Sequence, residues 1–205
     1  MLDSHNQQLR ERAAQEETIL VAQDTTTLNF SNRQISGIGL VGNGGTKGGH
    51  GPLAGMYVHT GLAMSTEGLP LGITSQKIYT RKAETTTVQY RATIKRKSIT
   101  EKETVRWVEA VSASKKVLPT SSLVIIGDRE SNIYEVFREG VAQGVNLLIR
   151  ASINRKLVGE ELKLFEKVAD SEIVTTYEAD VPNDAHTTSY AFGMIVNERT
   201  NRTSV

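Results

Sequence analysis

The sequence lacks cysteine altogether, and it has no long hydrophobic run. Without cysteine there is no disulfide framework and no thiolate metal site, which fits a reducing compartment. Because no stretch approaches the roughly 18 continuous apolar residues of a membrane-spanning helix, we expect no membrane segment. The polar N-terminal residues MLDSHNQQLRERAAQEE carry no apolar signal-peptide core, so we expect a cytoplasmic protein.

A strong excess of charge of either sign is also missing. The chain has 24 Lys and Arg against 23 Asp and Glu, which gives a formal net charge of +1. This total neither demands nor excludes DNA as a partner, because attraction depends on local patches. The basic stretch 81–97 is such a patch and includes Lys95, Arg96 and Lys97. It is either a phosphate-contacting surface or a solvated loop, and both interpretations stay open.

In place of long apolar runs the chain has a series of short ones. Strands are expected at 18–22, 56–64, 69–79, 123–126 and 146–151, from apolar and β-branched runs that turn signals bound. Helices are expected at 4–17, 100–117, 132–143 and 162–169, from composition and from apolar residues three and four positions apart. A glycine-rich loop is expected at 36–55, and two further strands at 173–181 and 190–196. Short strands separated by helices predict a mixed α/β sheet covered by helices.

The expected helices carry start and stop signals. Thr100 and Glu103 have the spacing of a capping box, so Thr100 is the predicted first cap. Asn132 is the predicted cap of the next helix, and Gly144 its end.

Two of the expected strands end on an aspartate. ILVAQ is followed by Asp24, and LVIIG is followed by Asp128. If these strands are neighbours, both carboxylates lie at one edge of the sheet, and a cation between them relieves their repulsion. Oxygen ligands favour a hard ion, Mg²⁺ or Mn²⁺. An aspartate after a strand also serves as a turn or helix cap, so a metal pair and two structural caps both stay open.

The segments around both aspartates resemble those of a known family. LVAQDTTTLNF and GDRESNIYEVF are similar to the segments around the first and second catalytic aspartates of bacterial insertion-sequence transposases of the DDE type. EKETVRWVEA and LLIRASINRK continue the resemblance, which runs from about residue 2 to residue 156. It implies an RNase H-like mixed sheet flanked by helices, with the start of a β-rich insertion at the C-terminal end.

The resemblance also implies a chemistry. Asp24 and Asp128 would bind Mg²⁺ or Mn²⁺ and act on DNA phosphodiesters, in cleavage and strand transfer. The implied partners are DNA at the transposon ends, and a second copy of the chain or a full-length transposase. Arg129 would contact a phosphate or pair with an acid such as Glu130. The other candidate DNA contacts are Arg150, Lys156, Lys95, Arg96 and Lys97.

The sequence departs from the family at the third carboxylate. The family's Y-x₂-R-x₃-E-x₆-K pattern is missing, because Gly193 stands where Tyr190 would require an arginine. We therefore expect the front part of a catalytic core that is inactive alone in strand transfer. The expected parts are a helical stub at 1–17, a partial core at 18–160 and the start of the insertion at 161–205.

Two other functions stay open. A metal-dependent nuclease would use Glu130 or Glu198 as its third ligand. A non-catalytic module would bind DNA or an intact transposase through the basic stretch 81–97 and through an unpaired sheet edge.

Overall fold

The computed structural model describes residues 2–30, 38–41, 53–81 and 97–172. The chain divides into two compact units, Met1–Ser152 and Ile153–Val205. In the second unit the structure describes one short helix, α5 (Leu164–Ala169), within the helix expected at 162–169. The strands expected at 173–181 and 190–196 lie outside the described residues, as do Lys95 and Arg96.

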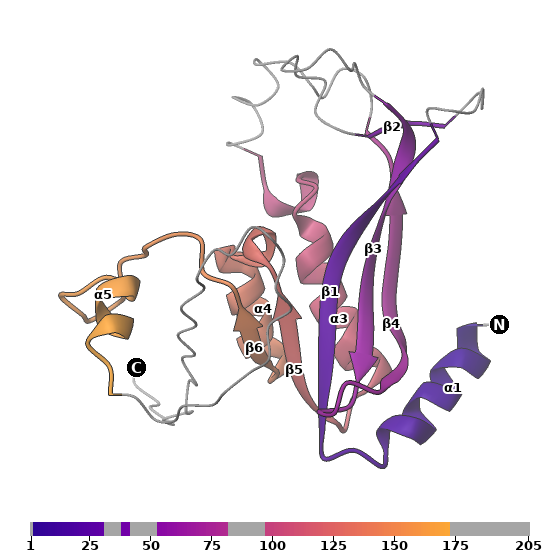
Figure 1. The fold of residues 1–205 in the computed structure, drawn as a ribbon, viewed down its shortest axis with the longest axis horizontal. Helices are drawn as coiled ribbons and strands as arrows, with labels where there is room; N and C mark the ends of the chain where they lie inside the picture. The colour runs from indigo at the N-terminus through magenta and orange to yellow at the C-terminus, as the bar shows by residue number, and fades with distance from the viewer. Residues whose placement is uncertain (1, 31–37, 42–52, 82–96, 173–205) are drawn as a thin grey trace, which may run out of the picture. The chain divides into compact units, whose positions relative to one another are not determined.

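The first unit is built on a mixed sheet (Figure 1). Its strands are β1 (Thr18–Asn29), β2 (Leu40–Val41), β3 (Leu53–Met64), β4 (Pro70–Tyr79), β5 (Ser122–Gly127) and β6 (Asn146–Ile149). β1 pairs antiparallel with β3 and parallel with β5, while β4 extends the sheet beyond β3 and β6 extends it beyond β5. β2 pairs with the first residues of β3. The expectation of a mixed α/β sheet flanked by helices is confirmed.

Helices precede the first strand and separate the later ones. They are α1 (Leu2–Ala13), the 3₁₀ turn η2 (Ile99–Glu101), α3 (Val105–Val117), the 3₁₀ turn η3 (Arg129–Ser131) and α4 (Tyr134–Gln143). α3 joins β4 to β5 and α4 joins β5 to β6, and the two helices pack against each other beside the sheet (Figure 1). None of the helices in the described ranges is both long and apolar enough to cross a membrane.

The core lies between the sheet and these helices. Alternate residues of β1 and β5 point toward α3, because successive side chains of a strand face opposite sides. Ile19, Val21 and Ile125 are at most 1% exposed, and Trp107 and Val111 of α3 cover them. The alternate side chains on the other face of the sheet are half-buried or exposed.

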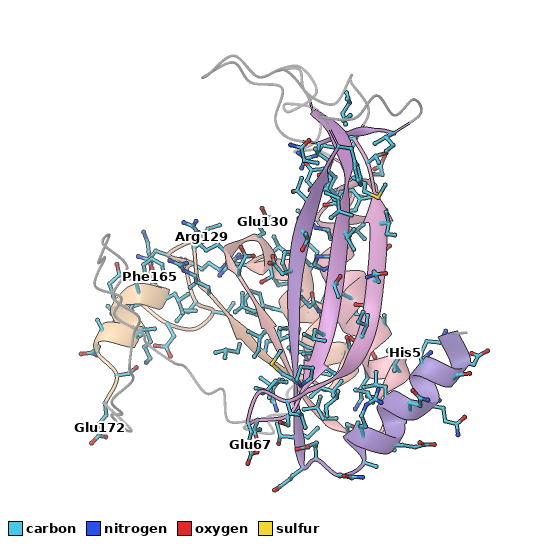
Figure 2. All side chains as sticks on the ribbon, turned by 45° about the vertical axis from the view of Figure 1, so that its right-hand side comes forward. His5, Glu67, Arg129, Glu130, Phe165 and Glu172 are labelled. Atoms are coloured by element: carbon cyan, nitrogen blue, oxygen red, sulfur yellow. The ribbon has the colours of Figure 1, made fainter. Side chains whose placement is uncertain are left out.

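Helix α1 is shorter than the expected 4–17 and more firmly held than its thin apolar face indicated. Leu9 is fully buried in the core and Ala13 almost so. Arg12 Nε donates to the Leu71 carbonyl at 2.6 Å, and His5 reaches the Ile73 carbonyl at 2.9 Å (Figure 2). These two polar contacts attach α1 to β4, so the helix needs only a few apolar side chains to stay packed on the sheet.

Strand β1 is longer than expected, and the prediction that it ends before Asp24 is wrong. Residues Leu20 to Asn29 pair with β3, so the strand continues through the threonines 25–27. Threonine is β-branched and favours strands, so a polar sequence did not mean a loop. Asp24 therefore lies inside a strand.

Two of the predicted caps are also wrong. The backbone N–H of Ser98 donates to the Glu101 carboxylate at 3.1 Å, so the capping box lies at η2, two residues before the expected one. Glu103 instead binds Arg81. The cap of α4 is Ile133, whereas Gly144 ends α4 with a φ of 64°, as predicted.

Candidate metal centre

The two aspartates follow the last paired residues of two neighbouring strands. The parallel pairing of β1 with β5 ends at Gln23 opposite Gly127. Asp24 and Asp128 are the next residue on each strand, so the register brings both to the same edge of the parallel part of the sheet. There β1 continues along β3, with Thr60 opposite Asp24, while the chain turns away at Asp128.

Both aspartates are exposed, Asp24 within β1 and Asp128 just after β5. One oxygen of each is in use locally: Asp24 Oδ1 accepts from the Thr25 N–H at 2.7 Å, and Asp128 Oδ1 accepts from the Glu130 N–H at 2.8 Å. Asp128 is thus the cap of η3, as its structural interpretation predicted. Neither Oδ2 atom takes part in a hydrogen bond with any described residue, so each carboxylate has an oxygen available for a ligand.

The donor set fits a hard divalent cation, since both groups offer carboxylate oxygen at an open edge. Within the described part of the chain, however, no cluster of three His, Cys, Asp or Glu side chains could hold a metal ion. Two carboxylates alone leave most of the coordination sphere of Mg²⁺ to water or to a substrate phosphate.

Glu130, the candidate third ligand of a nuclease, is held by another residue. Arg106 Nη2 lies 2.6 Å from Glu130 Oε2. The arginine side chain is 7% exposed and the glutamate side chain 62% exposed, so a buried cation depends on this partner. The cation in this pair is Arg106 of α3, whereas the sequence offered Arg129 as one possible partner of Glu130, with a phosphate contact as the other role for Arg129.

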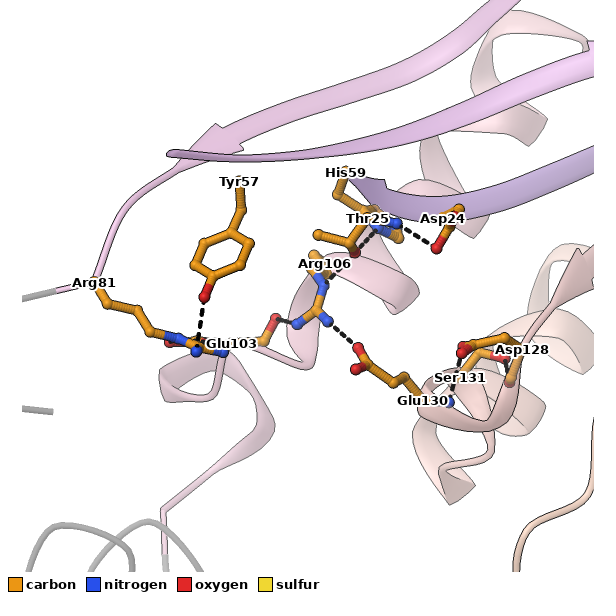
Figure 3. A network of polar contacts seen from close by, with 10 residues as sticks. All are labelled: Asp24, Thr25, Tyr57, His59, Arg81, Glu103, Arg106, Asp128, Glu130 and Ser131. Carbon is orange, nitrogen blue, oxygen red and sulfur yellow. Dashed lines mark hydrogen bonds and ion pairs between the residues drawn. The ribbon is translucent and has the colours of Figure 1, made fainter. Parts of the chain in front are cut away.

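The sequence pattern did not predict Arg106 and its contacts (Figure 3). Arg106 Nε donates to Thr25 Oγ1 at 3.2 Å, and Thr25 Oγ1 lies 2.9 Å from His59 Nδ1. The signal in the sequence was the spacing of Arg106, Ala110 and Ser114, which form a buried stripe on α3. An arginine at the start of such a stripe is typical of the solvated end of a helix. Periodicity alone therefore did not predict that Arg106 is buried.

His59 is almost fully buried and uncharged. Its pKa is lowered from 6.5 to about 4, first by burial and then by the nearby charge of Arg106, while Asp24 opposes the shift. Its ring packs edge-on against Trp107, with 4.5 Å between ring centroids. His59 is therefore a core histidine, although its Nε2 has no hydrogen-bond partner among the described groups.

A cavity of about 280 Å³ lies beside this network, between β4 and α3. Its lining includes His59, Ser75, Lys77 and Arg106, and neither aspartate borders it. The lining also includes Glu109, but this carboxylate is paired with Lys77. A lining with two cations and one paired carboxylate does not suit a divalent metal, so the aspartate edge is the better candidate.

The predicted DNA-contacting residues separate into groups. Arg129 and Arg150 are exposed, and the Arg150 N–H donates to the Gly127 carbonyl at 3.1 Å, so its backbone adjoins Asp128. Lys97 is half-buried just before η2. Lys156 belongs to the second unit, where its backbone forms a bridge with Lys163.

No protein-family model matches the chain, and the search of curated proteins found no match.

Proposed function

We propose that this chain forms the front part of the catalytic core of an insertion-sequence transposase of the DDE type, in which Asp24 and Asp128 hold Mg²⁺ or Mn²⁺ against a DNA phosphodiester. Without the third carboxylate it would be inactive alone in strand transfer. The observation that carries the proposal is the register of β1 and β5, whose pairing stops one residue before each aspartate. The D-T-T and D-R-E segments around them support the same function.

The strand arrangement supports an RNase H-like version of the fold. An antiparallel group, β4–β3–β1, continues into the parallel strands β5 and β6; α3 leads from β4 into β5, and α4 crosses from β5 to β6. In such sheets functional groups gather at the carboxyl ends of parallel strands, and Asp24 and Asp128 follow the end of the parallel pairing between β1 and β5.

The chain's own residues would bind and orient the DNA at this edge. A divalent cation there would polarise the phosphate and lower the pKa of an attacking water or hydroxyl. Asp24 and Asp128 would fix its position from two strands. Arg129 and Arg150 would add positive charge beside the carboxylates and contact neighbouring phosphates.

A nuclease that recruits Glu130 is a weaker candidate, because Arg106 already pairs with that carboxylate. Freeing it would take a charged partner from a buried guanidinium, which costs on the order of 1–3 kcal/mol. The non-catalytic alternative, a module that binds DNA or another transposase chain, is an outcome of the tests below.

Calorimetric titration with Mn²⁺ tests the metal centre. Mn²⁺ is the better probe because most sites of this kind bind it more tightly than Mg²⁺. We expect the chain to bind Mn²⁺ and the isosteric variants Asp24→Asn and Asp128→Asn each to lose at least about tenfold in affinity. Glu67→Gln is the matched control, because Figure 2 shows Glu67 in the β3–β4 turn, far along the strands from Glu130. A folded wild type without Mn²⁺ binding would rule out the proposed centre in this chain.

Fluorescence anisotropy with a labelled DNA duplex tests the partner. Phosphate contacts give a binding constant that falls steeply with salt concentration. We expect Arg129→Gln and Arg150→Gln each to reduce that dependence. DNA binding that persists in both aspartate variants and in wild type without Mn²⁺ would instead favour the non-catalytic module.

A further inference from the structure

Arg106 contacts the chain next to each of the two aspartates. We propose that it is the positioning residue of the centre, which holds the Asp24 strand and the Asp128 turn in one relative geometry. The role in metal binding rests on the proposed function. The contacts of Arg106 with the two segments can be tested without a metal.

The guanidinium of Arg106 uses three nitrogens on three different groups (Figure 3). Nε donates to Thr25 Oγ1 at 3.2 Å, and Thr25 directly follows Asp24. Nη2 donates to Glu130 Oε2 at 2.6 Å, and the Glu130 N–H is bonded to Asp128 Oδ1. Nη1 donates to the Glu103 carbonyl at 3.0 Å, just before α3. A single planar group on α3 therefore spans the two aspartate segments.

The orientation of this group is restricted on its faces as well as its edges. Arg106 Cζ lies 5.6 Å from the centroid of the Tyr79 ring and 5.5 Å from that of the Trp107 ring. Both distances are within the range of cation–π attraction. Because the side chain is 7% exposed, solvent cannot replace its partners cheaply. A planar fork with fixed donor directions suits this double contact, and a lysine ammonium does not.

Thr25 is fixed from its other side by His59. Since Thr25 Oγ1 accepts from Arg106 Nε, its own hydroxyl proton is available to His59 Nδ1, 2.9 Å away. The threonine side chain is thereby held between α3 and β3. The position of β1 at Asp24 thus depends on α3 through Thr25, and the position of the turn at Asp128 depends on the same arginine through Glu130.

The test is a set of variants that remove one contact of Arg106 at a time. The contact with Thr25 is the arm to β1, and the contact with Glu130 is the arm to η3. Thr25→Val removes the arm to β1 and keeps the shape of the side chain, while Glu130→Gln weakens the arm to η3. Arg106→Met removes both arms, and Arg106→Lys keeps the charge without the fork. The control is Lys77→Met, which breaks the exposed pair between Lys77 and Glu109 of α3 and touches neither arm.

The first readout is Mn²⁺ affinity. We expect each single-arm variant to lose affinity, and Arg106→Met to lose about tenfold or more. Removing both arms together, in Thr25→Val with Glu130→Gln, should cost no more than Arg106→Met alone, because both act through one residue. Arg106→Lys should recover only part of the loss. Lys77→Met should bind as wild type does. A loss of melting temperature without these affinity changes would show that Arg106 serves only the fold.

The second readout does not need the metal. In ¹⁵N NMR spectra, Thr25→Val should shift the amide signal of Glu130, and Glu130→Gln should shift that of Thr25. Both long-range effects should vanish when position 106 is Met or Lys. Folded proteins without such cross-effects would overturn the positioning role, even if wild type binds Mn²⁺. If wild type binds no Mn²⁺ but the two variants still show these amide shifts, Arg106 positions the two segments although the proposed function fails. If Arg106→Met does not fold, the positioning role is tested with Thr25→Val, Glu130→Gln and their double variant, by the same Mn²⁺ affinities and amide shifts.

Discussion

His59 should make the stability of this protein depend on pH. Its pKa in the folded protein is about 4, against 6.5 for an exposed histidine, mainly because the ring is buried. Between these values the unfolded chain binds a proton that the folded chain does not. The free energy of unfolding therefore rises with pH through this window. The contribution of His59 is fully present above about pH 6.5 and is lost as the pH falls toward 4.

The size of the effect follows from the two pKa values. At pH 5 the unfolded imidazole is almost fully protonated and the folded one almost fully neutral. That difference corresponds to about 1–2 kcal/mol once solvent screening is allowed for. Protonation would also place a second cation beside Arg106, whose guanidinium already shares Thr25 with this ring.

Urea denaturation at pH 7 and at pH 5 measures this contribution. Wild type should lose about 1–2 kcal/mol more between the two pH values than His59→Gln does. His5→Gln is the control, because His5 lies on α1 and contacts the Ile73 carbonyl, away from Arg106. The same pH dependence in wild type and in His59→Gln would refute the reasoning, as would an NMR titration of His59 with a midpoint near 6.5.

Three further substitutions test the packing, the turn and the site. Ile125→Ala should cost about 2–5 kcal/mol of unfolding free energy because Ile125 is 1% exposed, whereas Val141→Ala, at 80% exposed, should change it by less than about 0.5. Gly127→Ala places a Cβ 2.9 Å from Ser131 Cβ, so it should lower the melting temperature and the Mn²⁺ affinity together; unchanged values would show that Ser131 yields freely. Asp24→Val should abolish Mn²⁺ binding and raise stability by up to about 1 kcal/mol, and a destabilised variant would contradict a purely functional role for that carboxylate.

Much of the fold was predictable because local patterns and tertiary packing agree. Strands β4, β5 and β6 and the end of α4 at Gly144 all fall close to where the sequence places them. Each depends on a short-range property, either a run of β-branched residues or a residue that tolerates positive φ.

The errors come from partners far away in the sequence. β1 continues to Asn29 because β3 pairs with it, and a run of threonines gives no local sign of that partner. The capping box predicted at Thr100 fails because Glu103 binds Arg81, 22 residues earlier. Arg106 was missed for the same reason, since its partners Thr25 and Glu130 lie on other elements.

The corrected length of β1 changes the meaning of Asp24. At the end of a strand, an aspartate has an ordinary explanation as a cap or turn residue. Asp128 has that explanation here, because it caps η3 through the Glu130 N–H. Asp24 does not, since it lies inside β1 with Thr60 opposite it, and aspartate is depleted in strands. An unfavourable residue in a strand, one register step past the last pair with β5, is best explained by a function. Asp24 is therefore the better supported of the two proposed metal ligands, because Asp128 has a structural role as well.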